Sequence, residues 1–397
     1  HAVIDGARVS FAERLHDNNE FEVWSDKAQV HGFGTPRAMA EARPLHTLLM
    51  IQASHAAQTA FAPDERPYLV SRSGAAGMQR YVQTWSGDNY TAWETLKYNI
   101  RMGLGLAMSG VSNTGHDIGG FSGPAPSPEL LVRWVQHGIF LPRFSIHSWN
   151  DDQTVNEPWM YPAVTPQIRD LIVLRYRLMP YLYDLVWRYH TAYEPIIRPT
   201  YHDFPEDPRC LEENDDMLVG ANLLSAAVVE PGQTERRVWL PGTGGWYDWH
   251  TAQYFKAGQE VTLQAPLDGA PPLLAREGCA IPTNDGAIHF GKVEDVRGFQ
   301  VFPLKGEGAF EATCFEDDGH SRIGSAKGAG QGQWTLQVNC TALAVQISVV
   351  REGAQALAQS RVQLRVPAAD TRSLSVGNVP VLEDSVQGDW RYLTVQL

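Results

Sequence analysis

Cysteine and positive charge are both scarce in this 397-residue sequence. The four cysteines form no C-x-x-C pair and have no metal-ligand spacing, which argues against a disulfide scaffold and against structural zinc. There are 32 lysines and arginines against 45 aspartates and glutamates, and the net charge is -13. Nucleic-acid binding requires a basic surface, so the sequence does not favour a nucleic-acid partner.

Long apolar runs and nucleotide-binding motifs are also missing. No uninterrupted apolar stretch is long enough to span a bilayer. The sequence shows no signal-peptide pattern of basic, apolar and small residues. The glycine-rich stretch GSAKGAGQGQ lacks the residue order of a phosphate-binding loop. The sequence therefore predicts no membrane partner, no cofactor, no bound metal and a cytoplasmic location.

The first half of the chain shows helical patterns that alternate with short apolar runs. Residues 43–57 and 165–189 have helical periodicity, and a stripe of leucines in the second range includes Leu171, Leu178 and Leu185. Residues 91–100 open with Thr91 and Glu94 at the spacing of a capping box. Residues 127–138 begin with Ser-Pro and end with Gly138, which predicts an N-cap, a first-turn proline and a C-cap. Strands that alternate with helices predict parallel β/α units.

The second half has a different pattern. The stretches WTLQV, LAVQISVV and SRVQLRV alternate apolar and polar residues, as half-buried antiparallel strands do. Proline and glycine separate these short strands, and no further long helical pattern occurs. The expected fold is therefore α/β followed by all-β. We predict a catalytic domain over residues 1–194 and two β-sandwiches over 195–285 and 286–397.

Two acidic stretches in the first half carry candidate chemistry. HDNNEFEVWSD contains Asp17, and TWSGDNYTAWETL contains Asp88. Cleavage of a glycosidic bond with retention requires two carboxyl groups about 5 Å apart, one as nucleophile and the other as acid and base. In a β/α barrel such groups lie at the C-terminal ends of different strands. Between the two stretches, a predicted strand leads to Arg72.

Five motifs occur in an order that resembles glycoside hydrolase family 31, the α-glucosidase and α-xylosidase family. They are DNNEFEVW, SRSG, WSGDNYTAW, GHDIGGFSG and RFSIHS. The later stretches DDMLVGANLLSAAVV, LPGTGGWYDWHT and FEDDG resemble that family's C-terminal β domains. The resemblance covers nearly the whole chain, and it implies the C-terminal part of a (β/α)8 TIM-type barrel followed by two β-sandwiches.

The resemblance also implies roles for individual residues. Asp17 matches the catalytic nucleophile and Asp88 matches the acid/base. Arg72 matches an arginine that binds the sugar. Asp117 and His147 match residues that bind sugar hydroxyls, and Trp85 and Phe121 match aromatic residues of the pocket wall. Together they imply a retaining, exo-acting α-glucosidase whose substrate is an oligosaccharide or α-glucoside.

Several other residues allow more than one interpretation. Trp24 is a candidate outer sugar contact, whereas Trp149, Trp159 and Trp187 are interpreted as packing residues. The FEDDG stretch suggests either a calcium ligand set or a turn between strands, and the turn is favoured because the loop spacing of a calcium site is missing. Asn89 begins a formal glycosylation sequon, but its place inside the presumed pocket argues against modification.

The N-terminal residues depart from the family pattern. Only sixteen residues precede Asp17, and VSFAERLH stands where the family has an apolar strand. We therefore expect the C-terminal portion of a family member, with impaired activity unless a missing N-terminal segment or a second copy covers the open sheet. The alternatives are an α-transglucosylase, an α-xylosidase and a non-catalytic carbohydrate-binding fragment.

Overall fold

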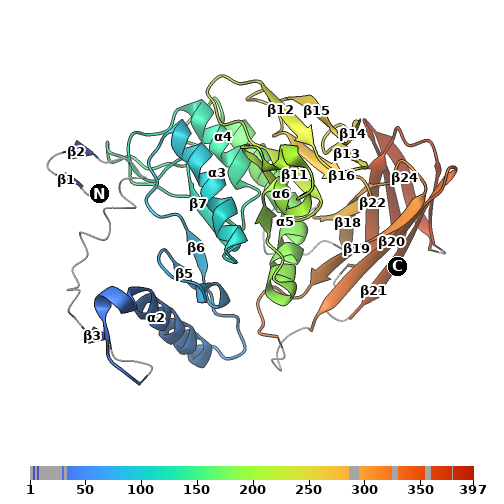
Figure 1. Cartoon of the computed structure of the whole chain (residues 1–397). Coiled ribbons are helices and arrows are strands. Elements are labelled where there is room, and N and C mark those ends of the chain that lie inside the picture. The colour runs from blue at the N-terminus through green and yellow to red at the C-terminus, as the bar shows by residue number, and fades with distance from the viewer. Residues whose placement is uncertain are drawn as a thin grey trace.

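The computed structural model describes residues 3–4, 7–8, 29–30, 34–285, 295–323, 330–353, 359–377 and 379–397. Figure 1 shows a parallel sheet with its helices, then a long central helix, and then two β-rich units that extend to the C-terminus. This order agrees with the predicted change from α/β to all-β. Among the described residues, no helix has the length and apolar character needed to cross a membrane.

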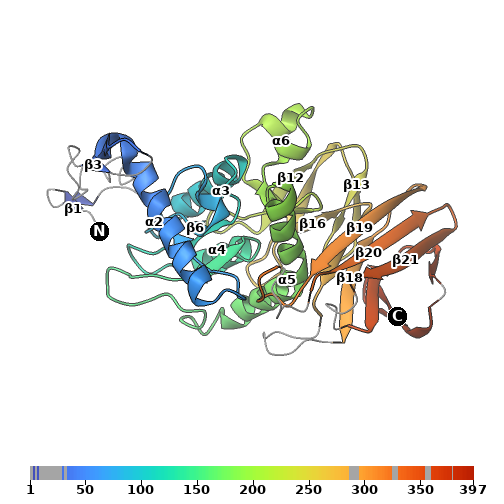
Figure 2. The same cartoon turned by 90° about the horizontal axis from the view of Figure 1, so that it is seen from below.

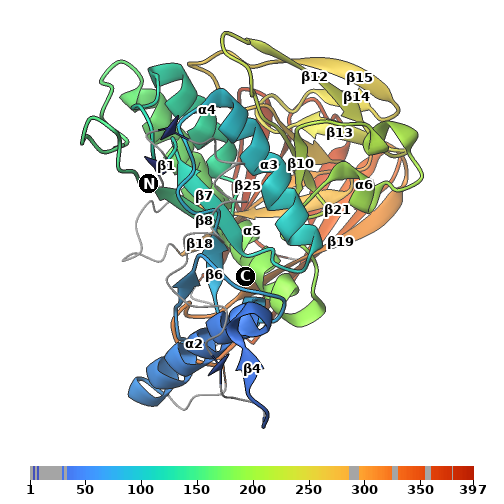
Figure 3. The same ribbon diagram turned by 60° about the vertical axis from the view of Figure 1, so that its left-hand side comes forward.

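Four parallel strands form the sheet of the first unit. They pair in the order of the chain, and each leads to the next: β5 (Val70–Ser71), β6 (Gln83–Trp85), β7 (Thr114–Ile118) and β8 (Arg143–Ile146). Helix α3 (Trp93–Met108) connects β6 to β7, and α4 (Pro128–Gly138) connects β7 to β8. In Figure 3, α3 and α4 lie toward the top of the view, and α2 (Met39–Phe61) lies at the bottom beyond β6.

Helix α4 forms where its local sequence predicts it. The Ser127 hydroxyl accepts a hydrogen bond from the Leu130 amide at 3.2 Å, and Pro128 occupies the first turn. The expected C-cap at Gly138 is wrong, because Gly138 is still helical and Ile139 follows it as the C-cap. A Cβ at Gly138 would lie 2.4 Å from Cδ1 of Ile118. Close packing of α4 on β7 therefore explains this glycine.

The capping box predicted for α3 is also wrong. Ala92 is the N-cap residue and makes no side-chain cap hydrogen bond. The Thr91 hydroxyl instead donates to the carbonyl of Gly119 at 3.1 Å. A tertiary partner thus replaces the expected local one, and it ties the start of α3 to the loop after β7.

Helix α5 (Thr165–Ala192) lies at the centre of the molecule, between the parallel sheet and the β units (Figure 2). The predicted leucine stripe is buried, with Leu171, Leu178 and Leu185 each no more than 5% exposed. The helix continues past Pro180. Its far side contacts the distal β unit, where the Trp187 and Phe315 rings stack at 3.9 Å. The packing interpretation of Trp187 is therefore confirmed.

The proximal β unit contains a six-stranded antiparallel sheet and a two-stranded ribbon. In spatial order, the sheet comprises β14 (Tyr254–Lys256), β13 (Gly245–Asp248), β16 (Leu273–Arg276), β11 (Leu223–Ala226), β10 (Asp216–Val219) and β9 (Ile197–Arg198). The ribbon pairs β12 (Glu235–Leu240) with β15 (Gln259–Gln264). Buried residues of the sheet and the ribbon, including Leu224 and Val238, share one core.

The distal β unit is a sandwich of two sheets. One comprises β17 (Cys279–Thr283), β18 (Val296–Phe302), β22 (Arg361–Pro367), β25 (Trp390–Gln396) and β24 (Val381–Gln387). The other comprises β19 (Gly308–Glu316), β20 (Gly332–Cys340), β21 (Ala344–Glu352) and β23 (Ser373–Val376). Inward residues of both sheets, such as Leu364 and Leu336, form its core. Because β17 pairs with β18, this sheet begins before residue 286, and the predicted domain boundaries remain predictions.

The remaining elements are short. They comprise four two-residue strands, two 3-10 helices and one four-residue helix: β1 (Val3–Ile4), β2 (Ala7–Arg8), β3 (Gln29–Val30), β4 (Arg37–Ala38), η1 (Met78–Arg80), η2 (Pro208–Leu211) and α6 (Thr200–Asp203).

Candidate active site

The predicted site residues that the structure describes gather at one edge of the parallel sheet. Arg72 follows β5, Asp88 follows β6, and His147 follows β8, while Asp117 is the penultimate residue of β7 and Phe121 lies in the loop after it. Because the four strands are parallel, their C-terminal ends lie side by side. Residues far apart in the sequence therefore meet at this edge.

Arg72 and Asp88 form an ion pair, with Nη1 of Arg72 donating to Oδ1 of Asp88 at 3.1 Å. Both side chains are partly accessible, at 57% and 37% exposure. Gly87 precedes Asp88 with a φ of +83°, and a Cβ there would lie 3.0 Å from Cδ of Arg72. Both the backbone conformation and the close approach of the arginine therefore favour glycine at this position.

Asp117 is buried and interacts with Arg143. Its side chain is 1% exposed, and Oδ1 accepts a hydrogen bond from Nη1 of Arg143 at 3.1 Å. No described residue donates a hydrogen bond to the buried Oδ2. Burial, the largest influence, raises the pKa of Asp117 to about 6, and the charge of Asp88 adds to this rise. The charges of Arg143 and His147 oppose it, so these four groups share one electrostatic environment.

Asn89 joins the loop after β6, which carries Asp88, to the end of β7 and to the loop that carries Phe121. It is fully buried, and its Nδ2 donates to the carbonyl of Asp117 at 3.1 Å, while its Oδ1 accepts from the Phe121 amide at 3.0 Å. The Phe121 ring lies 5.2 Å from the His147 ring between centroids. With both amide atoms engaged and no exposed surface, the Asn89 side chain has a structural role.

A cavity of about 620 Å³ lies along the sheet and extends from the first residues of β5, β6 and β8 to the residue after β8. Trp85 and His147 line it together with Arg143, with residues of the strands and loops and with one residue of α5: Tyr68, Val70, Gln83, Pro142, Phe144, Ser145 and Arg175. The volume is sufficient for a small-molecule ligand. Of the six predicted site residues that the structure describes, only Trp85 and His147 belong to this wall.

Two tryptophans of the loop that follows β8 differ from expectation. Trp149 is 61% exposed and Trp159 is 66% exposed, so the prediction that they are packing residues is wrong. The Trp149 amide donates to the carbonyl of Phe121 at 2.7 Å. The backbone of this loop is thereby attached to the site although the two rings face outward.

Asp17, the predicted nucleophile, and Trp24 lie outside the described residues. The structure therefore places the acid/base candidate and the five substrate-binding candidates, and the nucleophile remains a prediction from sequence.

Sequence reasoning placed Asn89 inside the presumed pocket, but it assigned no role to Asn89 or to Arg143. A signal for Arg143 was available in RFSIHS, because alternate residues of a strand face the same side and Arg143 precedes His147 by four. Asn89 had no comparable signal, since its role depends on two loops that meet only in the fold.

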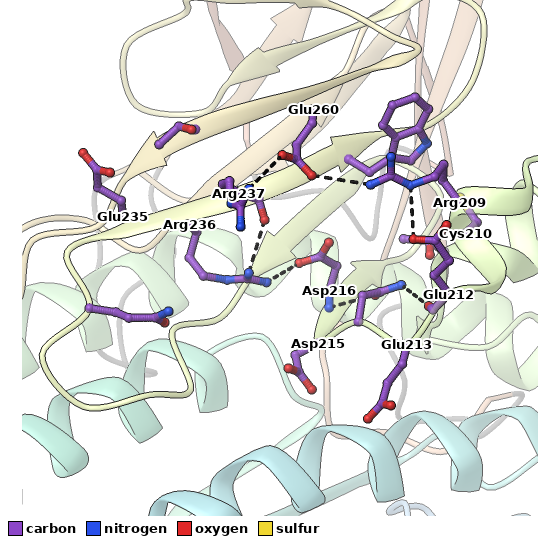
Figure 4. A pocket seen from close by; sticks show the side chains of 15 residues that line it. Arg209, Cys210, Glu212, Glu213, Asp215, Asp216, Glu235, Arg236, Arg237 and Glu260 are labelled. Carbon is purple, nitrogen blue, oxygen red and sulfur yellow. Dashed lines mark hydrogen bonds and ion pairs between the residues drawn. The ribbon is translucent and has the colours of Figure 1, made fainter.

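A second cavity, of about 540 Å³, lies in the proximal β unit at the ribbon of β12 and β15 (Figure 4). Most of its charged side chains bind one another. Arg236 pairs with Asp216 at 2.6 Å, and Arg209 contacts Glu260 at 3.4 Å. Burial raises the pKa of Asp216 to about 6. Because these charged side chains pair with one another, the polar lining of this cavity does not require a ligand.

Comparison with known proteins covers both the sheet unit and the proximal β unit. The model of the glycosyl hydrolase family 31 TIM-barrel domain matches residues 4–185, and that of the family's C-terminal domain matches residues 193–281. Human neutral α-glucosidase C is 38% identical over 261 residues, which are 65% of this chain and 28% of the relative. α-Glucosidase 2 of Bacillus thermoamyloliquefaciens is 31% identical over 304 residues, which are 76% and 38% of the two chains.

Solved structures have the same fold. A family 31 dextranase of Flavobacterium johnsoniae superposes with a TM-score of 0.76 at 24% identity, covering 91% of this chain and 50% of the other. A family 31 α-xylosidase of Xanthomonas citri gives 0.74 at 28% identity, with 91% and 40% covered. The chain spans between 28% and 38% of the length of the two curated relatives. The matched domains, their order and the shared fold show that the chain belongs to glycosyl hydrolase family 31.

Proposed function

We propose that this chain carries the acid/base part of a retaining, exo-acting α-glucosidase site that hydrolyses terminal α-linked glucose. The observation that carries this proposal is the meeting of Arg72, Asp88, Asp117 and His147 at the C-terminal edge of a parallel sheet. The names of the curated relatives, which are α-glucosidases, favour glucose as the sugar.

The proposed mechanism is a double displacement. The Asp17 carboxylate attacks the anomeric carbon while Asp88 donates its proton to the departing glycosidic oxygen. Asp88, now ionised, then removes a proton from water, and that water attacks the anomeric carbon and releases Asp17. The exposed position of Asp88 suits both steps, because leaving group and water must each reach it.

Other described residues support substrate binding. Trp85 and His147 form part of the cavity wall. The aromatic face of Trp85 suits the apolar face of a sugar, and the polar ring of His147 suits its hydroxyl groups. Arg72 holds the Asp88 carboxyl in place at 3.1 Å. Asp117 lies behind this wall, where it is bound by Arg143. No cofactor enters the proposed reaction.

The central test compares Asp17→Ala and Asp88→Ala with the unaltered chain on α-glucosides. Loss of an acid/base group is expected to reduce kcat/KM by roughly 10²- to 10⁴-fold. The loss in Asp88→Ala should be smaller for a p-nitrophenyl leaving group, which requires little protonation. Asp17→Ala should remove turnover of every substrate. Asp170→Ala, which changes a 74%-exposed carboxylate on α5, is the control.

A mechanism-based label tests the covalent step directly. A 5-fluoro-α-glucosyl fluoride should leave one glycosyl group on the peptide that contains Asp17, detected by mass spectrometry. Labelling elsewhere, or equal activity of all variants, would contradict the proposal. Sugar binding without turnover would identify a carbohydrate-binding fragment instead. A preference for α-xylosides would favour the α-xylosidase alternative, which the match to the Xanthomonas citri enzyme makes worth testing. Products longer than the substrate would indicate transglycosylation.

A further inference from the structure

Arg143, the first residue of β8, connects the cavity to the buried part of the site. Its side chain is 14% exposed and lies in the cavity wall beside Trp85 and His147. Asp117, by contrast, is 1% exposed and does not belong to that wall. A sugar in the cavity would therefore meet the arginine before the carboxylate.

Three contacts fix the orientation of the Arg143 side chain. Its Nη1 donates to Oδ1 of Asp117 at 3.1 Å and to the carbonyl of His116 at 3.4 Å. Its guanidinium carbon also lies 5.4 Å from the centre of the Trp85 ring. A cation beside an aromatic face is attracted to it. The guanidinium is thus held from one side by a carboxylate and from another by an indole.

Gly115 in β7 allows this strand to pack closely against β8 beside Arg143. A Cβ at Gly115 would lie 2.0 Å from the carbonyl oxygen of Arg143 and 2.9 Å from its Cβ. Glycine at this position therefore lets β7 and β8 approach each other at the level of the arginine. Asp117 lies two residues after Gly115 on β7, and its side chain reaches the Arg143 guanidinium.

The donor geometry of arginine leaves capacity for a ligand. A guanidinium carries five N–H donors in a planar fork. The hydrogen bonds recorded between Arg143 and described residues all use Nη1. Charged donors of this kind bind hydroxyl and carboxyl oxygens more strongly than neutral donors do.

We propose that Arg143 is a substrate-binding residue that donates hydrogen bonds to a hydroxyl of the bound sugar, and that Asp117 is a positioning residue that acts through Arg143. This inference rests on the proposed α-glycosidase function and refines its binding site. It assigns the direct contact to the arginine in the wall, and it gives the buried carboxylate the task of orienting that arginine.

The first test uses p-nitrophenyl α-glucoside and its 2-, 3-, 4- and 6-deoxy analogues. The unaltered chain should discriminate against one analogue by about 10- to 100-fold in kcat/KM, since a hydrogen bond to a charged group is lost. Arg143→Met should have a kcat/KM on the parent glucoside that is lower by a similar factor. Its kcat/KM values on that analogue and on the parent should be equal. Arg143→Lys should retain more of the discrimination than Arg143→Met, because lysine keeps the positive charge but lacks the planar fork of N–H donors.

A double-mutant cycle separates the roles of the two residues. Asp117→Asn should weaken the same discrimination, and it should cost little more once Arg143→Met is present, because its effect passes through the arginine. A full additional loss from Asp117→Asn in the Arg143→Met background would show that Asp117 contacts the sugar itself. That result, or an unchanged deoxy pattern in Arg143→Met, would overturn the inference.

Arg169→Met is the matched control. Arg169 lies on α5 outside the cavity wall, and its side chain is 72% exposed. This variant should change neither the melting temperature nor the deoxy pattern. Binding of glucose measured by calorimetry extends the test to a chain without turnover. An unaltered chain that neither binds nor hydrolyses sugars overturns the proposed function along with this inference, whereas an active chain with a normal Arg143→Met variant overturns only the inference.

Discussion

At the level of single residues, two buried histidines lie next to the candidate site. His116 on β7 and His137 on α4 are at most 1% exposed, and no described residue forms a hydrogen bond with the ring nitrogens of His137. Burial lowers the pKa of His116 to about 3 and that of His137 to about 4. Both rings are therefore neutral in the folded protein at neutral pH.

The low pKa of His137 predicts a loss of stability in acid. In the unfolded chain this ring binds a proton below about pH 6.5, whereas in the folded chain it does so only near pH 4. Stability is therefore lost as the pH falls from 6.5 toward 4. In His137→Gln, the loss of unfolding free energy between pH 7 and 4.5 should be smaller by about 2 kcal/mol, measured by urea unfolding. Equal losses in both proteins would contradict this prediction.

At the level of elements, the cap of α4 offers a test of local sequence information. Ser127 is exposed, and its hydroxyl accepts a hydrogen bond from the Leu130 amide. Ser127→Ala should lower the free energy of unfolding by about 1 kcal/mol, because one amide of the first turn loses its partner. Ser127→Asp should retain most of the stability, since its carboxylate accepts the same bond and favours the helix N-terminus. Unchanged stability of the alanine variant, in thermal or urea unfolding, would count against the cap.

Element boundaries were predictable where the signals were local. The cap and first-turn proline of α4, the buried stripe of α5 and the alternation of β20, β21 and β22 all follow from neighbouring residues, and the structure confirms them. The Thr91–Glu94 capping box failed because Thr91 binds the Gly119 carbonyl instead. A threonine hydroxyl serves either partner, and only the fold decides which one is near.

At the level of the whole molecule, the FEDDG stretch joins the distal sandwich to the first unit. Asp317 is 3% exposed and binds the Arg66 guanidinium, and it also accepts a hydrogen bond from the Tyr183 hydroxyl at 2.6 Å. The backbone amide of Arg66 donates to the carbonyl of His320 at 3.1 Å. The stretch is thus a connecting turn, and its first aspartate bridges the segment before β5 and helix α5.

This junction predicts coupled unfolding of the units. Asp317→Ala removes the buried carboxylate that accepts from both the Arg66 guanidinium and the Tyr183 hydroxyl, and it should cost about 2 kcal/mol. Tyr183→Phe, which keeps the Arg66 pair, should cost less. Calorimetry should show a single transition in the unaltered chain and a broadened or split one in Asp317→Ala. A sharp, unshifted transition in that variant would show that the junction does not couple the units.

The sequence by itself determined the class of fold, most of the long elements and the family, because periodicity, caps and ordered motifs are properties of neighbouring residues. It also indicated which strand ends carry the candidate chemistry. Only the tertiary structure decided that Asp117 is buried behind Arg143, that Asn89 ties the loops after β6 and β7 together, and that Trp149 and Trp159 are exposed. Asp117 and Arg143 are 26 residues apart, and their pairing exists only because β7 and β8 lie side by side, so no local pattern could express it.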